Sequence, residues 1–139
     1  MNYDNSNIFA KILRGEMPCV KVFEDDATLA IMDVFPQVSG HVLVIPKAAS
    51  RNILDIAPAD LAALILRVQM IAKAAQQALK ADGITISQFN EGAGGQTVFH
   101  THFHIMPRFN GIPLGAHGAS GMADVTVLKQ QADQIKAGL

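Results

Sequence analysis

Residues 96–107 read Gln-Thr-Val-Phe-His-Thr-His-Phe-His-Ile-Met-Pro and place three of the chain's five histidines at every second position. Successive side chains of an extended strand point to opposite faces. We therefore expect His100, His102 and His104 on one face, about 6.7 Å apart per step. The opposite face carries Phe99, Thr101, Phe103 and Ile105, a mostly apolar set that suits a core. The stretch predicts a strand with a core on one side and a row of imidazoles on the other.

A glycine-rich segment, Asn90-Glu-Gly-Ala-Gly-Gly95, lies directly upstream of this stretch. Such a loop brings main-chain N–H groups close to an anion. Three titratable side chains in strict alternation are rare in a purely structural face, so the pair of features indicates chemistry on phosphate. His-x-His is also a zinc-ligand spacing, but further candidate ligands downstream are few, with His117 and Asp124 in or near a stretch rich in glycine and alanine. We therefore expect no metal and no cofactor, with a metal site as the alternative.

Composition limits the class of protein. The 139 residues, 50% of them hydrophobic, fit one domain over residues 1–139 with a substantial core. The net charge of −1 favours neither nucleic acid nor an anionic membrane as a partner. No apolar run has the length of a membrane span, and the polar N-terminus does not resemble a signal peptide. The lone Cys19 excludes an internal disulfide and suits the cytoplasm.

Periodicity and turn residues predict the elements. In chain order these are a short helix from Ile8, ended by Gly15 and Pro18; strands over Val20–Glu24, Thr28–Val34 and His41–Pro46; a long helix from Pro58, ended by Gly83; strands over Ile84–Phe89 and Val98–Pro107; and a C-terminal helical segment over 122–139. Residues 1–6 are expected to be a flexible tail and 111–121 a mobile connection. The fold class is α+β, with an antiparallel sheet of about five strands.

The histidine row resembles the His-x-His-x-His motif of the histidine triad (HIT) nucleotide hydrolases and transferases. Five other segments are similar to segments of the Hint branch and its bacterial relatives, in the same order. They are Ile8–Pro18, Phe23–Asp26 with Asp33–Gln37, Gly40–Lys47, and Asn90–Thr97. Pro107-Arg108 is also seen in the Fhit branch. The resemblance covers nearly the whole chain and implies the HIT fold, with one long and one short helix and a homodimer.

The resemblance implies roles for the histidines. His102 would be the nucleophile that attacks the α-phosphorus of a nucleotide, because a neutral imidazole approaches an anionic phosphate without adding like charge. Histidine's unperturbed pKa of about 6.5 leaves much of it neutral near pH 7. The other ring nitrogen of His102 should donate to a fixed acceptor such as a loop carbonyl. His104 would contact the phosphoryl oxygens, with His100 and His41 supporting this pair.

The resemblance also implies the substrate-binding residues. Asp33 would accept hydrogen bonds from the two ribose hydroxyls, since a carboxylate offers two acceptors to a diol. The remaining expected contacts are Asn90, Gly95, Gln96 and Thr97 at the phosphate, and Val34, Ile8, Phe9, Ile12 and Ile31 at a purine slot. Taken without the resemblance, the apolar members would be assigned to the core and Asp33 to an ordinary turn.

Two departures from the family pattern stand out. Some bacterial relatives hold a structural zinc through a Cys-x-x-Cys pair and further histidines. Those positions are Asn7, Ala10 and Ala49 here, so we expect that zinc to be absent. The glycine loop is one residue shorter than in eukaryotic Hint proteins, which would alter access for the leaving group.

The resemblance implies a purine nucleotide hydrolase, acting on a nucleoside phosphoramidate or a similar AMP conjugate through a nucleotidyl-histidine. The alternatives are a dinucleoside polyphosphate hydrolase of the Ap3A/Ap4A type and a nucleotide-binding regulatory module with little turnover. The helix over 58–81 gives a separate reason to expect a homodimer, because a helix that is apolar nearly all round is usually buried on more than one side. The large apolar residues spread round its circumference include Leu61, Leu64, Ile65, Leu66, Val68, Met70 and Ile71.

Overall fold

The computed structural model describes residues 2–116 and 121–139. Five strands form one antiparallel sheet in the order β1-β2-β3-β5-β4. The strands are β1 (Lys21–Glu24), β2 (Thr28–Met32), β3 (Val42–Pro46), β4 (Gly83–Ser87) and β5 (Phe103–Arg108). The helices are α1 (Ile8–Leu13), α2 (Pro58–Leu79) and α3 (Val125–Lys136), with a short 3-10 helix, η1 (Gly92–Gly94), in the glycine loop. The sheet confirms the antiparallel α+β class expected from the sequence.

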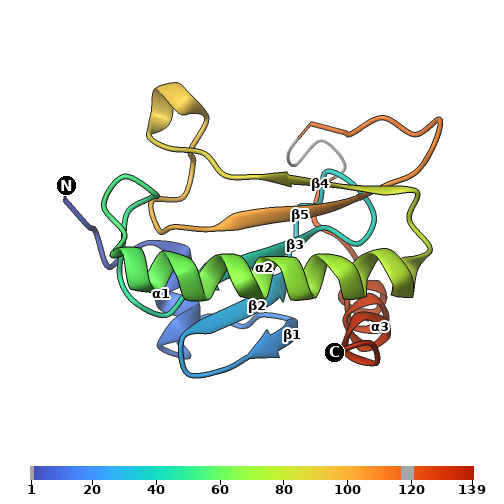
Figure 1. Cartoon of the computed structure of the whole chain (residues 1–139), viewed down its shortest axis with the longest axis horizontal. Helices are drawn as coiled ribbons and strands as arrows, with labels where there is room; N and C mark the ends of the chain where they lie inside the picture. The colour runs from blue at the N-terminus through green and yellow to red at the C-terminus, as the bar shows by residue number, and fades with distance from the viewer. Residues whose placement is uncertain (1, 117–120) are drawn as a thin grey trace.

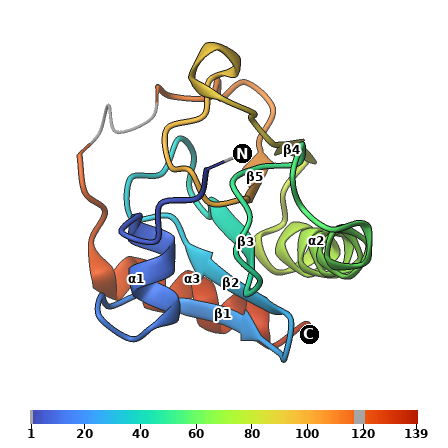
Figure 2. The same cartoon turned by 90° about the vertical axis from the view of Figure 1, so that its left-hand side faces the viewer.

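Helices cover the sheet on two sides (Figures 1 and 2). On one face, Val42 and Val44 of β3 belong to a large core cluster with residues of α2 and α3. On the other, Leu43 and Ile45 pack with Phe9 of α1. All five residues of β3 are therefore buried, which explains why its sequence is a continuous apolar run. The smaller, α1-side face is the one that carries the histidines.

Helix α2 begins at Pro58 and ends at Leu79, so the expected end at Gly83 is wrong. The residue that leaves the helix is Lys80, which has a left-handed backbone with φ of 54° and a main-chain N–H directed at the carbonyls of Gln76 and Gln77. This left-handed position terminates the helix in the way that glycine more often does. Gly83 is instead the first residue of β4.

One glycine is required by close packing just before His41. Gly40 has φ of 86°, and a Cβ placed on it would collide with the side chain of Leu79 at the end of α2. Glycine removes both the backbone strain and the clash. This position lies immediately before the buried His41, which β3 follows.

The strand expected over Val98–Pro107 is wrong in its first half, because β5 begins only at Phe103. The backbone N–H of Thr101 donates to the carbonyl of Ser50 at 2.9 Å, and the two hydroxyls lie 2.7 Å apart. These bonds hold residues before Phe103 against the 50–52 segment instead of in the sheet. Of the three histidines, only His104 lies on a strand.

The expected flexible tail and mobile connection both contain residues that bond to other parts of the protein, and their mobility stays a prediction. The Tyr3 hydroxyl donates a hydrogen bond to His100. Within 111–121, residues 117–120, including His117, lie outside the described residues, while the N–H of Gly115 donates to the Gln37 carbonyl at 2.8 Å. The C-terminal segment contains α3, capped at its N-terminus by the Asp124 side chain. Over the described part of the chain, no helix combines the length and hydropathy needed to cross a membrane.

Candidate active site

His102 lies in a buried position with one ring nitrogen fixed by the main chain. Its Nδ1 is 2.6 Å from the carbonyl oxygen of His100. A carbonyl only accepts, so Nδ1 carries the proton and the neutral ring has its lone pair on Nε2. The loop-carbonyl acceptor expected from the sequence is therefore present. This geometry gives His102 the tautomer that a nitrogen nucleophile needs.

His100 holds that carbonyl in place through both of its own ring nitrogens. Its Nε2 donates to the Pro46 carbonyl at 2.8 Å, and its Nδ1 accepts from the Tyr3 hydroxyl at 2.6 Å. The Asn7 side chain donates to the same hydroxyl at 3.0 Å. Burial lowers the pKa of His100 below its usual value, since a charged imidazolium would lose its hydration there. His100 is thus a neutral supporting residue, and Tyr3 is a partner that the sequence did not reveal.

A second chain of hydrogen bonds orients His104. The backbone N–H of Gln37 donates to Nδ1 of His41 at 3.1 Å, which places the proton of neutral His41 on Nε2. That Nε2 is 2.9 Å from Nδ1 of His104. In its neutral form His104 then carries its proton on Nε2. The ring centroids of His102 and His104 are 5.0 Å apart. In the neutral forms of the two rings, an Nε2 that can accept, on His102, and an Nε2 that can donate, on His104, therefore lie on neighbouring side chains.

Asp33 lies next to this second chain, directly after β2. It is 5% exposed, and its Oδ1 accepts from the Phe35 backbone N–H at 2.8 Å. Its Oδ2 is 3.6 Å from Nε2 of His41. The structure therefore places Asp33 with the histidines, as the resemblance implied, but most of it is shielded from solvent. The ribose contact itself stays a prediction.

The donor set of Asp33, His41 and His104 also has the chemistry of a zinc site. Each offers one ligand atom, and these atoms lie within 4.8 Å of one another. Nitrogen and carboxylate oxygen are ordinary zinc ligands. The 2.9 Å contact between His41 and His104, however, is a hydrogen bond that holds a proton between two of the three ligand atoms. The residues fit a metal only if that bond is given up.

The glycine loop is stabilised from within. Gln96 is buried and uses its whole side chain inside the protein: its amide oxygen accepts from Asn52 and from the Glu91 N–H, and its nitrogen donates to the carbonyls of Arg51 and Val98. The main-chain N–H groups of Gly95 and Gln96 donate to carbonyls of the same loop. The expected phosphate contact of the Gln96 side chain is therefore not what the structure shows, because those bonds hold the loop together.

A carboxylate that the sequence did not single out anchors the loop at its start. Glu91 has a positive φ of 65°, which is unusual for a residue with a side chain. Its carboxylate accepts from Nε of Arg51 at 2.7 Å and from Nη2 at 3.1 Å, and Asn52 donates to it as well. The Arg51 guanidinium also lies over the ring of Phe99, 4.2 Å from its centroid. No local pattern pairs residues 51 and 91, so only the fold reveals this clamp.

The other phosphate-loop candidates are only partly used by the protein. Asn90 accepts at Oδ1 from the Ile53 N–H at 2.9 Å and exchanges two hydrogen bonds with the side chain of Gln88. Thr97 is exposed beside the buried Gln96. Phe89, not predicted as a site residue, places its ring 5.5 Å from that of His104. The region around His104 is therefore bordered by this loop.

The expected purine-slot residues do not all lie together. Phe9 is buried and packs edge-on against His102 with ring centroids 4.9 Å apart. Ile31 belongs to the same apolar cluster, with Ile12 packed against it. Val34 packs instead against the cluster on the opposite face of the sheet, and Ile8 is exposed. Phe9 and Ile31 are thus next to the histidines, whereas Val34 contributes mainly to the core.

The fold and this histidine network define an α+β protein with four buried, hydrogen-bonded histidines beside a glycine-rich loop. A model of the HIT domain matches residues 14–111. This chain belongs to the HIT domain family, a family of nucleotide-binding hydrolases. The recognition made from the sequence is confirmed.

Individual relatives agree with this assignment. A solved HIT-like protein from Bartonella henselae, described as involved in cell-cycle regulation and holding an unknown ligand, is 51% identical, covers 99% of this chain and 100% of its own, and has a TM-score of 0.92. A zinc-bound histidine triad protein from Mycobacterium smegmatis is 34% identical over 96% of this chain and 92% of its own, with a TM-score of 0.84. The adenylylsulfatase HINT3 of Arabidopsis thaliana is 41% identical over 75% of this chain. This chain spans about half of that plant protein, 53% of its length.

Proposed function

We propose that this protein is a purine nucleotide hydrolase that cleaves at the α-phosphate through a nucleotidyl-His102 intermediate. The observation that carries the proposal is the hydrogen bond from Nδ1 of His102 to the His100 carbonyl, which sets the tautomer. Nε2 would form a bond to phosphorus while the bond from phosphorus to the leaving group breaks. Water would then displace His102 and release the nucleoside monophosphate.

His104 would act next to the nucleophile. With Nδ1 accepting from His41, its Nε2–H is the donor that would bind a phosphoryl oxygen as negative charge develops there. Asn90 and Thr97 would complete the contacts at the phosphate, and Gly95, whose N–H donates to the Gly92 carbonyl, would let the backbone of the loop come close to it. Asp33 would bind the ribose hydroxyls, with Phe9, Ile8, Ile12 and Ile31 as the proposed surroundings of the purine.

The leaving group we favour is an amine, which makes the substrate a nucleoside phosphoramidate. Two other groups are supported by specific observations. Pro107-Arg108 after the triad favours a dinucleoside polyphosphate, and the relative named adenylylsulfatase favours a sulfate attached to AMP. All three substrates share the adenylyl group that His102 would accept.

Direct measurement of the intermediate tests the proposal. We expect the intact protein to hydrolyse an AMP-amine conjugate and to carry one AMP in mass spectra of acid-free quenched samples. His102→Ala should lose both signals, and His102→Gly should regain turnover when imidazole is added. Rates close to wild type in His102→Ala would remove this residue as the nucleophile. Binding of AMP without any turnover would favour the regulatory module.

A homodimer in the cytoplasm remains part of the proposal. The α2 surface exposes Ile65 and Leu66, and the neighbouring edge strand β4 exposes Ile86. Such an apolar patch beside an open strand edge suits a two-fold contact with a second copy. Light scattering at low micromolar concentration tests this, and a mass near 14.9 kDa, that of one chain, would refute it.

A further inference from the structure

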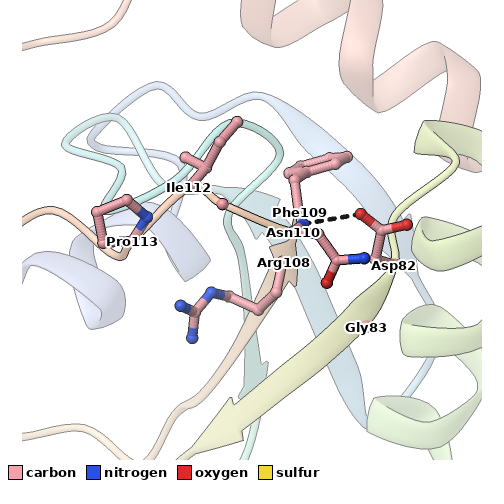
Figure 3. A pocket seen from close by; sticks show the side chains of 8 residues that line it. Asp82, Gly83, Arg108, Phe109, Asn110, Ile112 and Pro113 are labelled. Atoms are coloured by element: carbon pink, nitrogen blue, oxygen red, sulfur yellow. Dashed lines mark hydrogen bonds between the residues drawn. The ribbon is translucent and has the colours of Figure 1, made fainter.

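A cavity of about 490 Å³ lies at the end of β5, where the chain turns back after Arg108 (Figure 3). Phe109, Ile112 and Pro113 form part of its wall, together with the start of β4. The turn is closed by a bridge between Phe109 and Ile112. None of these residues belongs to the histidine network, so the cavity needs its own explanation.

Arg108 brings an incompletely paired cation into this cavity. Its Nη1 donates to Oγ1 of Thr85 at 3.2 Å, but its Nε is buried and has no hydrogen-bond partner among the described residues. Among the described residues, no carboxylate forms an ion pair with Arg108. Asp82 also lines the cavity, yet its carboxylate accepts from the Asn110 N–H at 2.8 Å, and the Arg108 guanidinium points away from it (Figure 3). A buried donor of a charged group without a partner is unfavourable, and an anion would satisfy it.

The guanidinium shares a sheet face with His104. The two residues are four apart on β5, so their side chains point to the same side. Across the sheet Gly83 pairs with Arg108 and Ser87 with His104, and Thr85 lies between them on β4. Because Arg108 bonds to Thr85, its side chain leans toward the His104 end. Ser87, which pairs with His104, lies two residues along β4 from Thr85, a distance of about 6.7 Å.

Ser87 adds a second unsatisfied group on this face. Its Oγ is buried and has no hydrogen-bond partner among the described residues, and it stands opposite His104 in the register. The alternation places Ile84 and Ile86 on the other side, where they line a groove against α2. Ser87 and Arg108 thus lie on one face, on either side of Thr85, each with a donor available.

We propose that Arg108, held by Thr85 and assisted by Ser87, binds an oxyanion carried by the leaving group of the substrate. The proposal rests on the proposed function, since it places the reacting phosphorus at His102 and His104. A carboxylate or phosphate a few bonds beyond that phosphorus would reach the guanidinium. The protein would then prefer AMP conjugates whose leaving group is anionic.

A pair of nearly isosteric substrates tests the preference. AMP joined through nitrogen to β-alanine ends in a carboxylate, and AMP joined to β-alaninamide ends in a neutral amide. We expect wild type to have the higher kcat/KM for the carboxylate. Arg108→Met should lower the carboxylate-to-amide ratio about 10-fold or more, with the amide rate within twofold of wild type. Arg108→Lys should keep part of the ratio, Ser87→Ala should lower it less, and Arg67→Met, which alters a cation on α2, should leave it unchanged.

The possible results distinguish a failure of the proposed oxyanion site at Arg108 from a failure of the proposed hydrolase function. An unchanged ratio in a folded Arg108→Met protein overturns the proposal. Weaker inhibition by inorganic phosphate in that variant, with an unchanged ratio, shows a site for a free anion and also overturns the leaving-group assignment. If wild type turns over neither conjugate, the proposed function fails, and calorimetric titration with pyrophosphate decides the rest. Equal pyrophosphate binding by wild type and Arg108→Met would then reject the oxyanion site too, whereas loss of binding in the variant would retain it.

Discussion

Removing the hydroxyl of Tyr3 should disturb a histidine that lies 97 positions away in the sequence. In the structure this hydroxyl donates to Nδ1 of His100, and the His100 carbonyl in turn accepts from His102. Tyr3→Phe keeps the aromatic ring, whose centroid is 5.7 Å from the His100 ring in an edge-on contact. The substitution therefore deletes the hydrogen bonds of the hydroxyl with His100 and with Asn7 and leaves the ring contact in place.

The size of the effect follows from the burial of the acceptor. His100 is 1% exposed, so water has little access to the nitrogen that loses its donor. Leaving a buried acceptor unsatisfied costs about 1–3 kcal/mol. We expect the free energy of unfolding to fall by about 1–2 kcal/mol. Because the His100 carbonyl holds His102, the substitution should also displace the His102 ring, and kcat should fall by up to about tenfold with KM little changed.

Urea unfolding and steady-state kinetics measure the two effects separately. The slope of unfolding free energy against urea should be the same in both proteins, so that a shift in midpoint reports stability alone. Tyr3→Leu provides the comparison, because it removes the ring contact as well and should be less stable than Tyr3→Phe. Unfolding free energies for wild type and Tyr3→Phe that agree within about 0.3 kcal/mol would refute the reasoning and leave the N-terminal segment outside the site.

Three further outcomes are expected. Burial lowers the pKa of His100, so the unfolded chain binds more protons than the folded protein below pH about 6.5. The free energy of unfolding should therefore fall as the pH decreases from there. Urea unfolding at pH 7.5 and 5.5 should show a smaller fall in this free energy for His100→Asn than for wild type. Turnover of an AMP-amine should survive EDTA, whereas loss of activity restored by zinc alone would establish the metal alternative at Asp33, His41 and His104. Ribonucleotide substrates should exceed 2′-deoxy analogues in kcat/KM by about 5-fold or more, and Asp33→Asn should reduce this difference; equal rates on both sugars would remove Asp33 from substrate binding.

Local pattern was sufficient for most of the fold. Short runs of strand-forming residues bounded by turn residues located four strands to within about two residues, and spacing of three and four located α2. These signals work because they report which side of an element is buried, and burial repeats along the element. The end of α2 was misplaced because Lys80 adopts the left-handed backbone that the sequence suggested for Gly83.

Some residues of the candidate site were predicted from the sequence and others were not. The resemblance named the four histidines, and the structure places all of them in one buried network. Gln96 was expected to face the substrate but is used within the loop, because its amide finds four partners there. Arg51 and Glu91 had no sequence signal, since each taken alone is an ordinary charged residue.

The sequence by itself determined the family, the antiparallel sheet, the identity of the histidines and the backbone acceptor expected for one of them. The tertiary structure decided the rest: that β5 starts after His102, that His41 meets His104 from 63 positions away, and that Tyr3 closes the network. The physical reason is the range of the interactions. Periodicity reflects neighbours within a few residues, whereas hydrogen bonds between distant segments form only once packing has brought their donors and acceptors within about 3 Å.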